Sequence, residues 1–380
     1  MGSDDYERYP KLTRYLAGQP IDLTAWQKFY RSLPAAHLPG KVGTPAQDVL
    51  QALNQFDPEW DEVDAALSNP NAYWPLNYER PFDNSFRGVT SMIPIAKVLP
   101  LKAAAHFDMN QNDLSEKDYL LSLQIDRSLA SKCTLVNYLV LNGVRAIDDG
   151  ILWEGLHRHI WNDSQLHEME SGVAETDMLA LAAKTFRIER ACSFQTMKMM
   201  QSKDSKLYED LNEENFSEAW YFFQIRPIGW WDQDRYSYSL VAQNAIDAIH
   251  LDKGILTKLS DDEPPRSQAL WVYTPITQTI RSIFENTEPK IAQAETNRRL
   301  ARLACRLEEY RIAQGQYPEK LEELPDLPAH LNQEVLSEEP LRYERKGDGY
   351  LLYSVGWNQK DDGGVVAKDD KEGDWVWPSP

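Results

Sequence analysis

The chain has 380 residues, of which 42% are hydrophobic, and its 40 Lys and Arg against 59 Asp and Glu give a formal net charge of −19. A chain of this length and composition can bury one large core or two smaller ones. Because a negative charge of this size repels phosphate backbones and anionic lipid surfaces, we expect no nucleic-acid partner.

The three cysteines, Cys133, Cys192 and Cys305, are widely spaced, and each lies in an apolar helical pattern. This odd number supports neither a disulfide framework nor a thiolate zinc site, so we expect buried core thiols. No run of about 18 apolar residues occurs, which predicts no membrane span. Residues 1–3 (MGS) resemble a cloning remnant, so we expect a native signal or anchor to have been removed.

Two consecutive helices are predicted near the start of the chain. Thr44 can cap a helix whose first residue is Pro45, and apolar residues then recur on one face. Asp57 and Pro58 repeat this start signal immediately afterwards. The segment 68–81 contains three prolines and three asparagines, which predicts a loop.

Longer helical patterns fill the middle of the chain. The segment 115–140 keeps helical spacing of its apolar residues with one phase slip, which predicts one or two packed helices. Segments 175–201 and 216–248 show the same spacing, and the second is broken at Pro227 and Gly229. We therefore expect residues 1–287 to form a mainly α-helical domain, as an irregular bundle or a solenoid.

The pattern changes near residue 287. Thr287 and Pro289 predict the start of a helix that ends at Gly315, and at about 1.5 Å per residue it would be about 40 Å long. Glu295 and Arg299 lie four residues apart, a spacing that predicts an ion pair on its exposed face.

Strand patterns follow this helix. Segments 341–345 and 350–355, joined by a Gly-containing turn, predict a β-hairpin, and a last short strand is predicted over 375–377. Residues 288–380 are therefore expected to form a small α+β module with one long helix and an antiparallel β-meander.

This module resembles the globular part of the major pseudopilin of type II secretion. The resemblance rests on the order of elements and on the segments 310–324, 340–343 and 349–356. The segments 300–318 and 361–378 also resemble the tail of a group of uncharacterised secreted or membrane-anchored planctomycete and verrucomicrobial proteins. The resemblance implies a fold for the tail and an extracytoplasmic location, but no activity. The long helical region in front of the tail argues against assembly as a pilin subunit.

The loop between the last two strands is the one segment whose residue types suggest a metal. Carboxylate and amide oxygens at this density suit Ca²⁺, and glycines let the chain wrap around an ion. The resemblance implies the same, since the corresponding pseudopilin loop binds calcium. The alternative is a solvated acidic loop in a chain that is acidic throughout. The candidate ligands of a structural calcium ion are Asn358, Asp361, Asp362, Asp369, Asp370 and Asp374.

Other candidate groups have ordinary structural explanations. A histidine-rich stretch contains His157, His159, His167 and Glu168, but His157 and His159 point to different faces of a helix, so surface or capping roles are favoured. Four acidic residues could include an acid–base pair, but only their separation in space would identify one. These are Asp148, Asp149, Glu154 and Asp163.

Aromatic residues are dense between positions 220 and 238, where they form either a stacking platform for a sugar or peptide or part of the core. They are Trp220, Tyr221, Phe222, Phe223, Trp230, Trp231, Tyr236 and Tyr238. No G-x-S-x-G, Gly-rich phosphate loop, H-E-x-x-H or C-x-x-C sequence occurs.

The sequence thus favours an extracytoplasmic, non-enzymatic binding or scaffold protein at the cell envelope, with a protein or polysaccharide partner. The alternative is an enzyme that hydrolyses a polysaccharide or peptide in a cleft lined by these aromatic residues. A third hypothesis is a direct role in a secretion apparatus.

Overall fold

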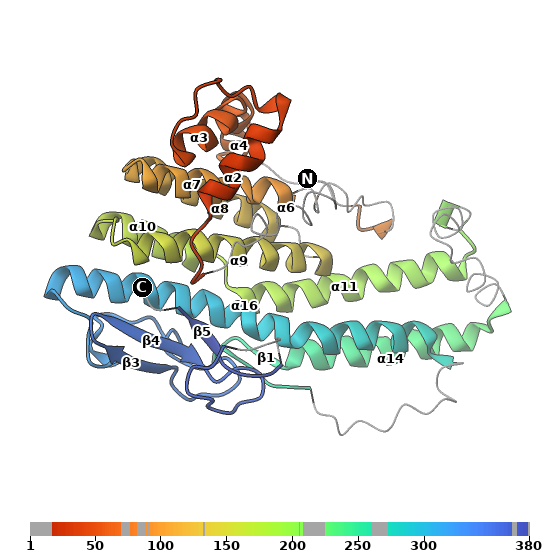
Figure 1. Ribbon diagram of the computed structural model, residues 1–380. Helices are drawn as coiled ribbons and strands as arrows, with labels where there is room; N and C mark the ends of the chain where they lie inside the picture. Colours follow the sequence, from red (N-terminus) through yellow and green to blue (C-terminus); the bar gives the residue numbers. More distant parts are fainter. Residues whose placement is uncertain are drawn as a thin grey trace.

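The computed structural model describes residues 17–69, 77–81, 89, 92–131, 134–204, 206–207, 225–259, 273–366 and 371–378. A mainly α-helical N-terminal region is followed by a long helix and a three-stranded antiparallel sheet (Figure 1). The predicted fold class is therefore confirmed.

The described helices of the N-terminal region are α2 (Leu23–Ser32), η2 (Pro34–Ala36), α3 (Pro45–Asn54), α4 (Asp57–Leu67), α6 (Met92–Ala96), α7 (Val98–Asp108), α8 (Asn112–Ala130), α9 (Leu135–His157), α10 (Asp163–Ala174), α11 (Met178–Gln201) and α14 (Ile228–Asp247). They are followed by a two-stranded pair, β1 (Ile249–His250) and β2 (Ile255–Leu256). The C-terminal part comprises α16 (Pro275–Gln314), the short helical turn η4 (Leu321–Glu323), β3 (Arg342–Lys346), β4 (Gly349–Ser354) and β5 (Trp375–Trp377).

Local start signals explain where several helices begin. Thr44 and Gln47 form a reciprocal capping box at the start of α3, and Pro45 occupies its first position. The predicted segment 115–140 contains parts of two helices, because Thr134 caps α9 by accepting a hydrogen bond from the N–H of Asn137. Asp177 caps α11 in the same manner, so the predicted helix over 175–201 is also confirmed.

The predicted start of the long helix is wrong. α16 begins at Pro275, so Pro289 lies inside a helix of 40 residues, which is about 60 Å long. A proline inside a helix costs about 3 kcal/mol because it removes one N–H donor and crowds the preceding turn. Packing on both sides of this proline outweighs that cost, since Phe284, Ile291 and Ala292 are all buried.

α16 runs along the whole described length of the molecule and contacts both parts of the chain (Figure 1). Its N-terminal half packs beside α11 and α14, and its C-terminal half lies between α10 and the sheet. On the other side of α10 the remaining helices are stacked in layers, with α8 on α9, α7 on α8 and α3 on α7.

The sheet has the order β3-β4-β5, and both pairs of neighbours are antiparallel. Leu352 in the central strand is opposite Tyr343 on one side and Trp377 on the other. Gly347 adopts a φ of 60° in the turn between β3 and β4, a conformation that glycine reaches without strain. The predicted hairpin and last strand are confirmed.

Two large hydrophobic clusters each combine residues from the helical region and from the tail, which from here on means the residues that follow α16. Trp26, Phe107 and Trp161 share one cluster with Tyr350 and Trp377 of the sheet. The second cluster combines residues of α9, α11 and α16 with Val335 and Trp375 of the tail. The predicted domain boundary at 287/288 thus falls within a continuous helix, between two parts that share their cores.

Two of the three cysteines lie in the described residues, and both are free thiols. Cys305 is fully buried in α16, as predicted, and burial raises its pKa well above the ordinary value. Cys192 is only half-buried, and burial raises its pKa to about 11. Cys133 lies outside the described residues. Across the described ranges, no helix combines the length and the apolar character that a membrane-crossing segment needs.

Candidate functional site

In the acidic loop of the tail, the carboxylates of two predicted calcium ligands, Asp361 and Asp374, accept protein hydrogen bonds. Asp374 is buried, and its carboxylate accepts from the backbone N–H of Asp362 at 3.4 Å and of Gly364 at 2.7 Å. Asp361 accepts from the Tyr353 hydroxyl at 2.9 Å. Its hydrogen bonds keep the pKa of Asp361 below the ordinary value. These two carboxylates thus hold the loop in shape.

The other predicted ligands do not complete a metal site within the part of the loop that the structure describes. The Asn358 side chain accepts from the N–H of Lys360 at 2.9 Å. Asp369 and Asp370 lie outside the described residues. Among described residues, no three His, Cys, Asp or Glu side chains are grouped as metal ligands. The described donors therefore form no cage for a cation by themselves, and calcium binding stays a prediction.

The histidines that the sequence singled out have separate structural surroundings. His157 stacks on Trp153, with ring centroids 4.9 Å apart. His159 follows the end of α9, and its Nδ1 lies 2.8 Å from Oε1 of Glu308 in α16. His167 is exposed on α10. The predicted capping and surface roles fit these positions.

Of the aromatic residues between 220 and 238, the structure describes Trp230, Trp231, Tyr236 and Tyr238. Trp231 and Tyr238 are fully buried, and the Tyr238 ring lies against Phe194 and Phe284 in the core. Tyr236 is exposed. These described aromatic side chains point to different environments and do not form one stacking platform. The remaining four, at 220–223, lie outside the described residues.

Two of the four acidic candidates belong to a buried charge cluster between α8 and α9. Asp126 and Asp148 are fully buried, and Nε of Arg145 lies 3.1 Å from Oδ2 of Asp126. The Ser122 hydroxyl donates to Oδ1 of Asp148, whereas Oδ2 has no hydrogen-bond partner among the described residues. Burial, and then the charge of Asp126, raises the pKa of Asp148. Burial also raises the pKa of Asp149, to about 7.

This cluster makes a prediction for the effect of pH on stability. Because the folded chain holds protons that the unfolded chain releases from about pH 4 upward, the cluster stabilises the fold in acid and loses this effect as pH rises through 7. Asp148→Asn keeps the acceptor for Ser122 and removes the titrating proton. We expect it to raise the free energy of unfolding at pH 8 relative to the unsubstituted chain, and to do so more at pH 8 than at pH 4, because no buried carboxyl then has to hold a proton.

Thermal melts at pH 4 and pH 8 test this expectation, with Asp232→Asn as the control because Asp232 is exposed on α14. The control is expected to change stability by less than about 0.5 kcal/mol. A variant Asp148→Asn that loses stability equally at both pH values would contradict the account.

The other two acidic candidates are used elsewhere. Glu154 accepts from Arg158 at 2.6 Å and from the N–H of Ile21 at 3.4 Å. Asp163 is the first residue of α10. A carboxylate favours the start of a helix, where backbone N–H groups are free. The four residues therefore do not form one acid–base pair.

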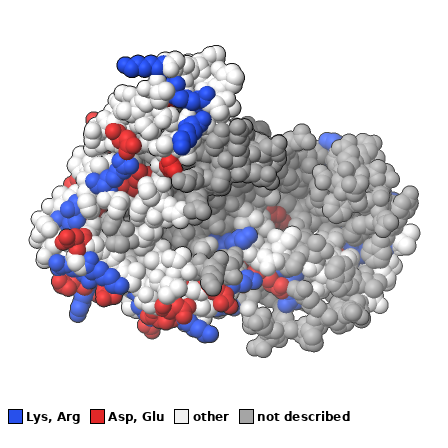
Figure 2. Space-filling view, in the orientation of Figure 1, with Lys and Arg blue, Asp and Glu red and all other residues white. Residues whose placement is uncertain are grey.

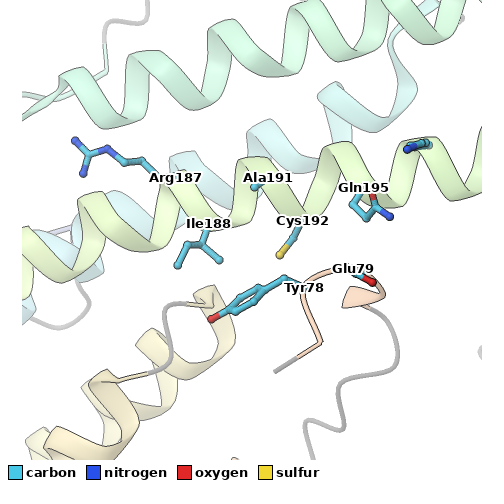
Figure 3. Close-up of a pocket in the computed structure, with 8 residues that line it drawn as sticks. Tyr78, Glu79, Arg187, Ile188, Ala191, Cys192 and Gln195 are labelled. Atoms are coloured by element: carbon cyan, nitrogen blue, oxygen red, sulfur yellow. The ribbon is translucent and has the colours of Figure 1, made fainter. Parts of the chain in front are cut away.

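A groove on α11 is one surface cavity of the described part of the chain. It has a volume of about 660 Å³, and its floor is formed by one face of α11. Figure 3 shows Ile188 and Cys192 pointing towards Tyr78 of the segment 77–81, while Arg187 points away from them. Arg80 in this segment donates to both carboxylate oxygens of Asp204 at 3.0 Å. The groove is thus apolar along its centre and charged at its edge.

Another cavity lies between α3, α7 and the start of α8 and has a volume of about 560 Å³. His106 in the last turn of α7 lines it, and Nδ1 of His106 lies 2.8 Å from Oδ2 of Asp118 in α8. Both residues are less than 10% exposed. Sequence analysis missed this pair, because 12 residues and a helix–helix turn separate the two.

Buried ion pairs along α16 connect the two parts of the chain. Glu295, in the middle of this helix, accepts from Arg298 at 2.8 Å and from Arg299 at 2.9 Å. All three are buried, so the prediction of an exposed pair at Glu295 and Arg299 is wrong. Burial alone would raise the pKa of Glu295, but the two guanidinium groups hold it below the ordinary value. The i, i+4 spacing identified the pair, whereas its burial depends on elements far away in the sequence.

Arg299 also joins α16 to two other segments. Its Nη2 donates to the carbonyl of Gly254 in the β1–β2 turn at 2.6 Å, and its Nη1 donates to the carbonyl of Gln333 in the tail at 2.8 Å. Gly254 has a φ of +65°, and a Cβ there would lie 3.0 Å from Nη2 of Arg299. One buried side chain therefore holds the helical region, α16 and the tail together.

Further pairs repeat this arrangement towards the end of α16. Glu170 of α10 accepts from Arg302 at 2.7 Å. Glu308 accepts from the Tyr317 hydroxyl at 2.8 Å and faces His159 of the helical region. Charge-assisted bonds of this kind are stronger than neutral ones when they are buried.

Comparisons of the chain with protein-family models, with curated proteins and with solved structures give no match.

Proposed function

We propose that this chain is an extracytoplasmic binding or scaffold protein of the cell envelope. The observation that carries the proposal is the buried position of Arg299, which bonds to α16, to the β1–β2 turn and to the tail at once. This connection holds the tail rigidly against the helical layers. A rigid arrangement suits a protein that presents several surfaces to a partner at fixed distances from one another.

The surface chemistry is consistent with a protein or polysaccharide partner. On the face that Figure 2 shows, basic and acidic side chains are interspersed over the described surface and form no large patch of one sign. With a formal net charge of −19, attraction to polyanions is unfavourable at long range. Recognition would then depend on local cavities, such as those on α11 and between α3, α7 and α8.

Cell fractionation tests the location and the partner together. The natural gene product, with a C-terminal tag, is expressed in its own cells, and cytoplasmic and envelope fractions are compared. We expect recovery in the envelope fraction, together with saturable binding of the purified chain to isolated envelope polysaccharide or protein. Recovery only in the cytoplasm would contradict the proposal. Copurification with secretion components would instead favour a direct role in a secretion apparatus.

Calcium binding by the loop 358–374 is part of this proposal. Without an ion, five aspartates within fourteen residues repel one another and hold β5 less firmly. We expect millimolar calcium to raise the thermal midpoint of chelator-treated chain. The double variant Asp369→Asn, Asp370→Asn is expected to remove that rise. An unchanged midpoint on adding calcium to the unsubstituted chain would refute the calcium site.

A further inference from the structure

The cavity between α3, α7 and α8 contains a histidine whose ring is oriented by a buried carboxylate. α7 and α8 form a tight hairpin, in which the N–H of Gln111 donates to the carbonyl of His106 at 2.9 Å. This hairpin brings Nδ1 of His106 within 2.8 Å of Oδ2 of Asp118. Because Nδ1 faces the carboxylate, Nε2 is the ring nitrogen that is left for a ligand.

Nε2 of His106 has no hydrogen-bond partner among the described residues, and His106 is part of the cavity wall. The His106 side chain is 10% exposed, so the imidazole is held by its surroundings and reaches solvent over a small area. An oriented imidazole at the edge of a cavity has the geometry of a general base.

Amide side chains line the same cavity. Gln51 and Asn54 of α3 and Gln111 before α8 are exposed, and their side chains make no hydrogen bond within the described residues. They offer N–H donors to a developing negative charge, as does Lys41 in the loop before α3. The cavity therefore holds a base and several donors at its surface.

The carboxylates around the cavity do not suit glycoside hydrolysis, which generally uses two of them on either side of the bond. Asp48 also lines the cavity, but its carboxylate is bound by Arg31 at 2.5 Å and 2.8 Å. The Arg31 hydrogen bond holds the pKa of Asp48 below the ordinary value. Asp118 is occupied by His106. An imidazole base with amide donors suits acyl transfer instead.

We propose that His106 is the general base of an esterase site in this cavity, acting on a small, neutral, polar carboxylic ester. Nε2 takes a proton from a water molecule, whose oxygen attacks the ester carbonyl carbon. The tetrahedral intermediate then collapses, the bond to the alcohol oxygen breaks, and that oxygen receives the proton from Nε2. The products are a carboxylic acid and an alcohol, and Asp118 is a positioning residue. This activity goes beyond the proposed binding or scaffold role.

Hydrolysis of 4-nitrophenyl acetate by the full chain tests the proposal. We expect His106→Gln to lower kcat/KM by at least about 100-fold, the lower end of the range for general-base catalysis. His167→Gln is the matched control, because His167 is exposed on another helix, α10, and it is expected to leave the rate unchanged. A rate that His106→Gln does not change, or no rate above that of buffer for the unsubstituted chain, would overturn the proposal.

Two further measurements separate catalysis from a structural role and do not depend on the folding of His106→Gln. The double variant Gln51→Ala, Asn54→Ala replaces two exposed side chains. We expect it to lower kcat by about 10-fold or more without changing the melting midpoint. Asp118→Asn is expected to lower kcat with little change in KM and to shift the pH–rate profile.

The charged groups around the dyad are Lys102 of α7, Lys117 of α8, Asp48 of α3 and Lys41 of the preceding loop. Their contribution to the pH–rate profile is common to all variants. A solvent deuterium isotope effect on kcat is expected for a general base, and its absence would indicate direct attack by the imidazole and refute the proposed step.

Discussion

Replacing Glu295 by alanine is expected to lower the free energy of unfolding by about 3–5 kcal/mol. The substitution leaves the guanidinium groups of Arg298 and Arg299 buried without their carboxylate partner, at 8% and 3% side-chain exposure. It also removes the acceptor for the N–H of Met178 at the start of α11. Because removal of one partner strands the others in a low-dielectric interior, the loss exceeds the stabilisation that the pair provides.

Urea unfolding measures this change, and Glu319→Ala provides the control. Glu319 forms an ion pair with Arg345 at 2.6 Å, but its side chain is 69% exposed. Exposed pairs contribute about 0–1 kcal/mol, so the control is expected to stay within that range. If both variants lost the same small amount of unfolding free energy, the buried ion pairs along α16 would not stabilise the fold.

Replacing Trp377 by alanine is the second substitution with a large expected effect. Trp377 is buried in β5 and belongs to the cluster that includes Trp26 and Phe107 of the helical region. Truncation of a buried tryptophan costs about 3–5 kcal/mol, because it removes apolar burial and leaves a cavity. We therefore expect a loss of this size in the free energy of unfolding, measured by urea titration.

The neighbouring Val376→Ala is a matched control from the same strand. Val376 lies on the opposite face of β5 and is only half-buried, so its truncation is expected to cost about 1 kcal/mol. A comparable loss of unfolding free energy in both variants would show that burial of Trp377 in the shared cluster does not stabilise the fold. Since Trp375 belongs to the second cluster, β5 connects both cores to the tail.

Features that depend on neighbouring residues could be predicted from the sequence. The capping box at Thr44, the turn between β3 and β4, and the end of α16 at Gly315 follow from local hydrogen bonding and backbone preference. The start of α16 could not be predicted in this way. Pro289 is an unfavourable residue in a helix interior, and only tertiary packing explains why the helix continues through it.

The candidate sites were less predictable, because their residues meet across helices. Asp126 and Asp148 are 22 positions apart, and neither position alone indicates that α8 and α9 bury them together. The same applies to His106 and Asp118. Along the sequence, Asp118, Asp126 and Asp148 each stand beside another charged residue, so nothing marks them as buried. A search for polar residues on the apolar faces of adjacent helices would have singled them out.

Hydrogen–deuterium exchange under increasing urea tests most directly whether α16 makes the helical region and the tail one folded unit. We predict that the slowest amides of α10 and of β4 open with the same free energy and the same dependence on urea, since both elements pack on α16. Exchange of the β4 amides through a separate opening of lower free energy, with α10 still protected, would contradict this prediction.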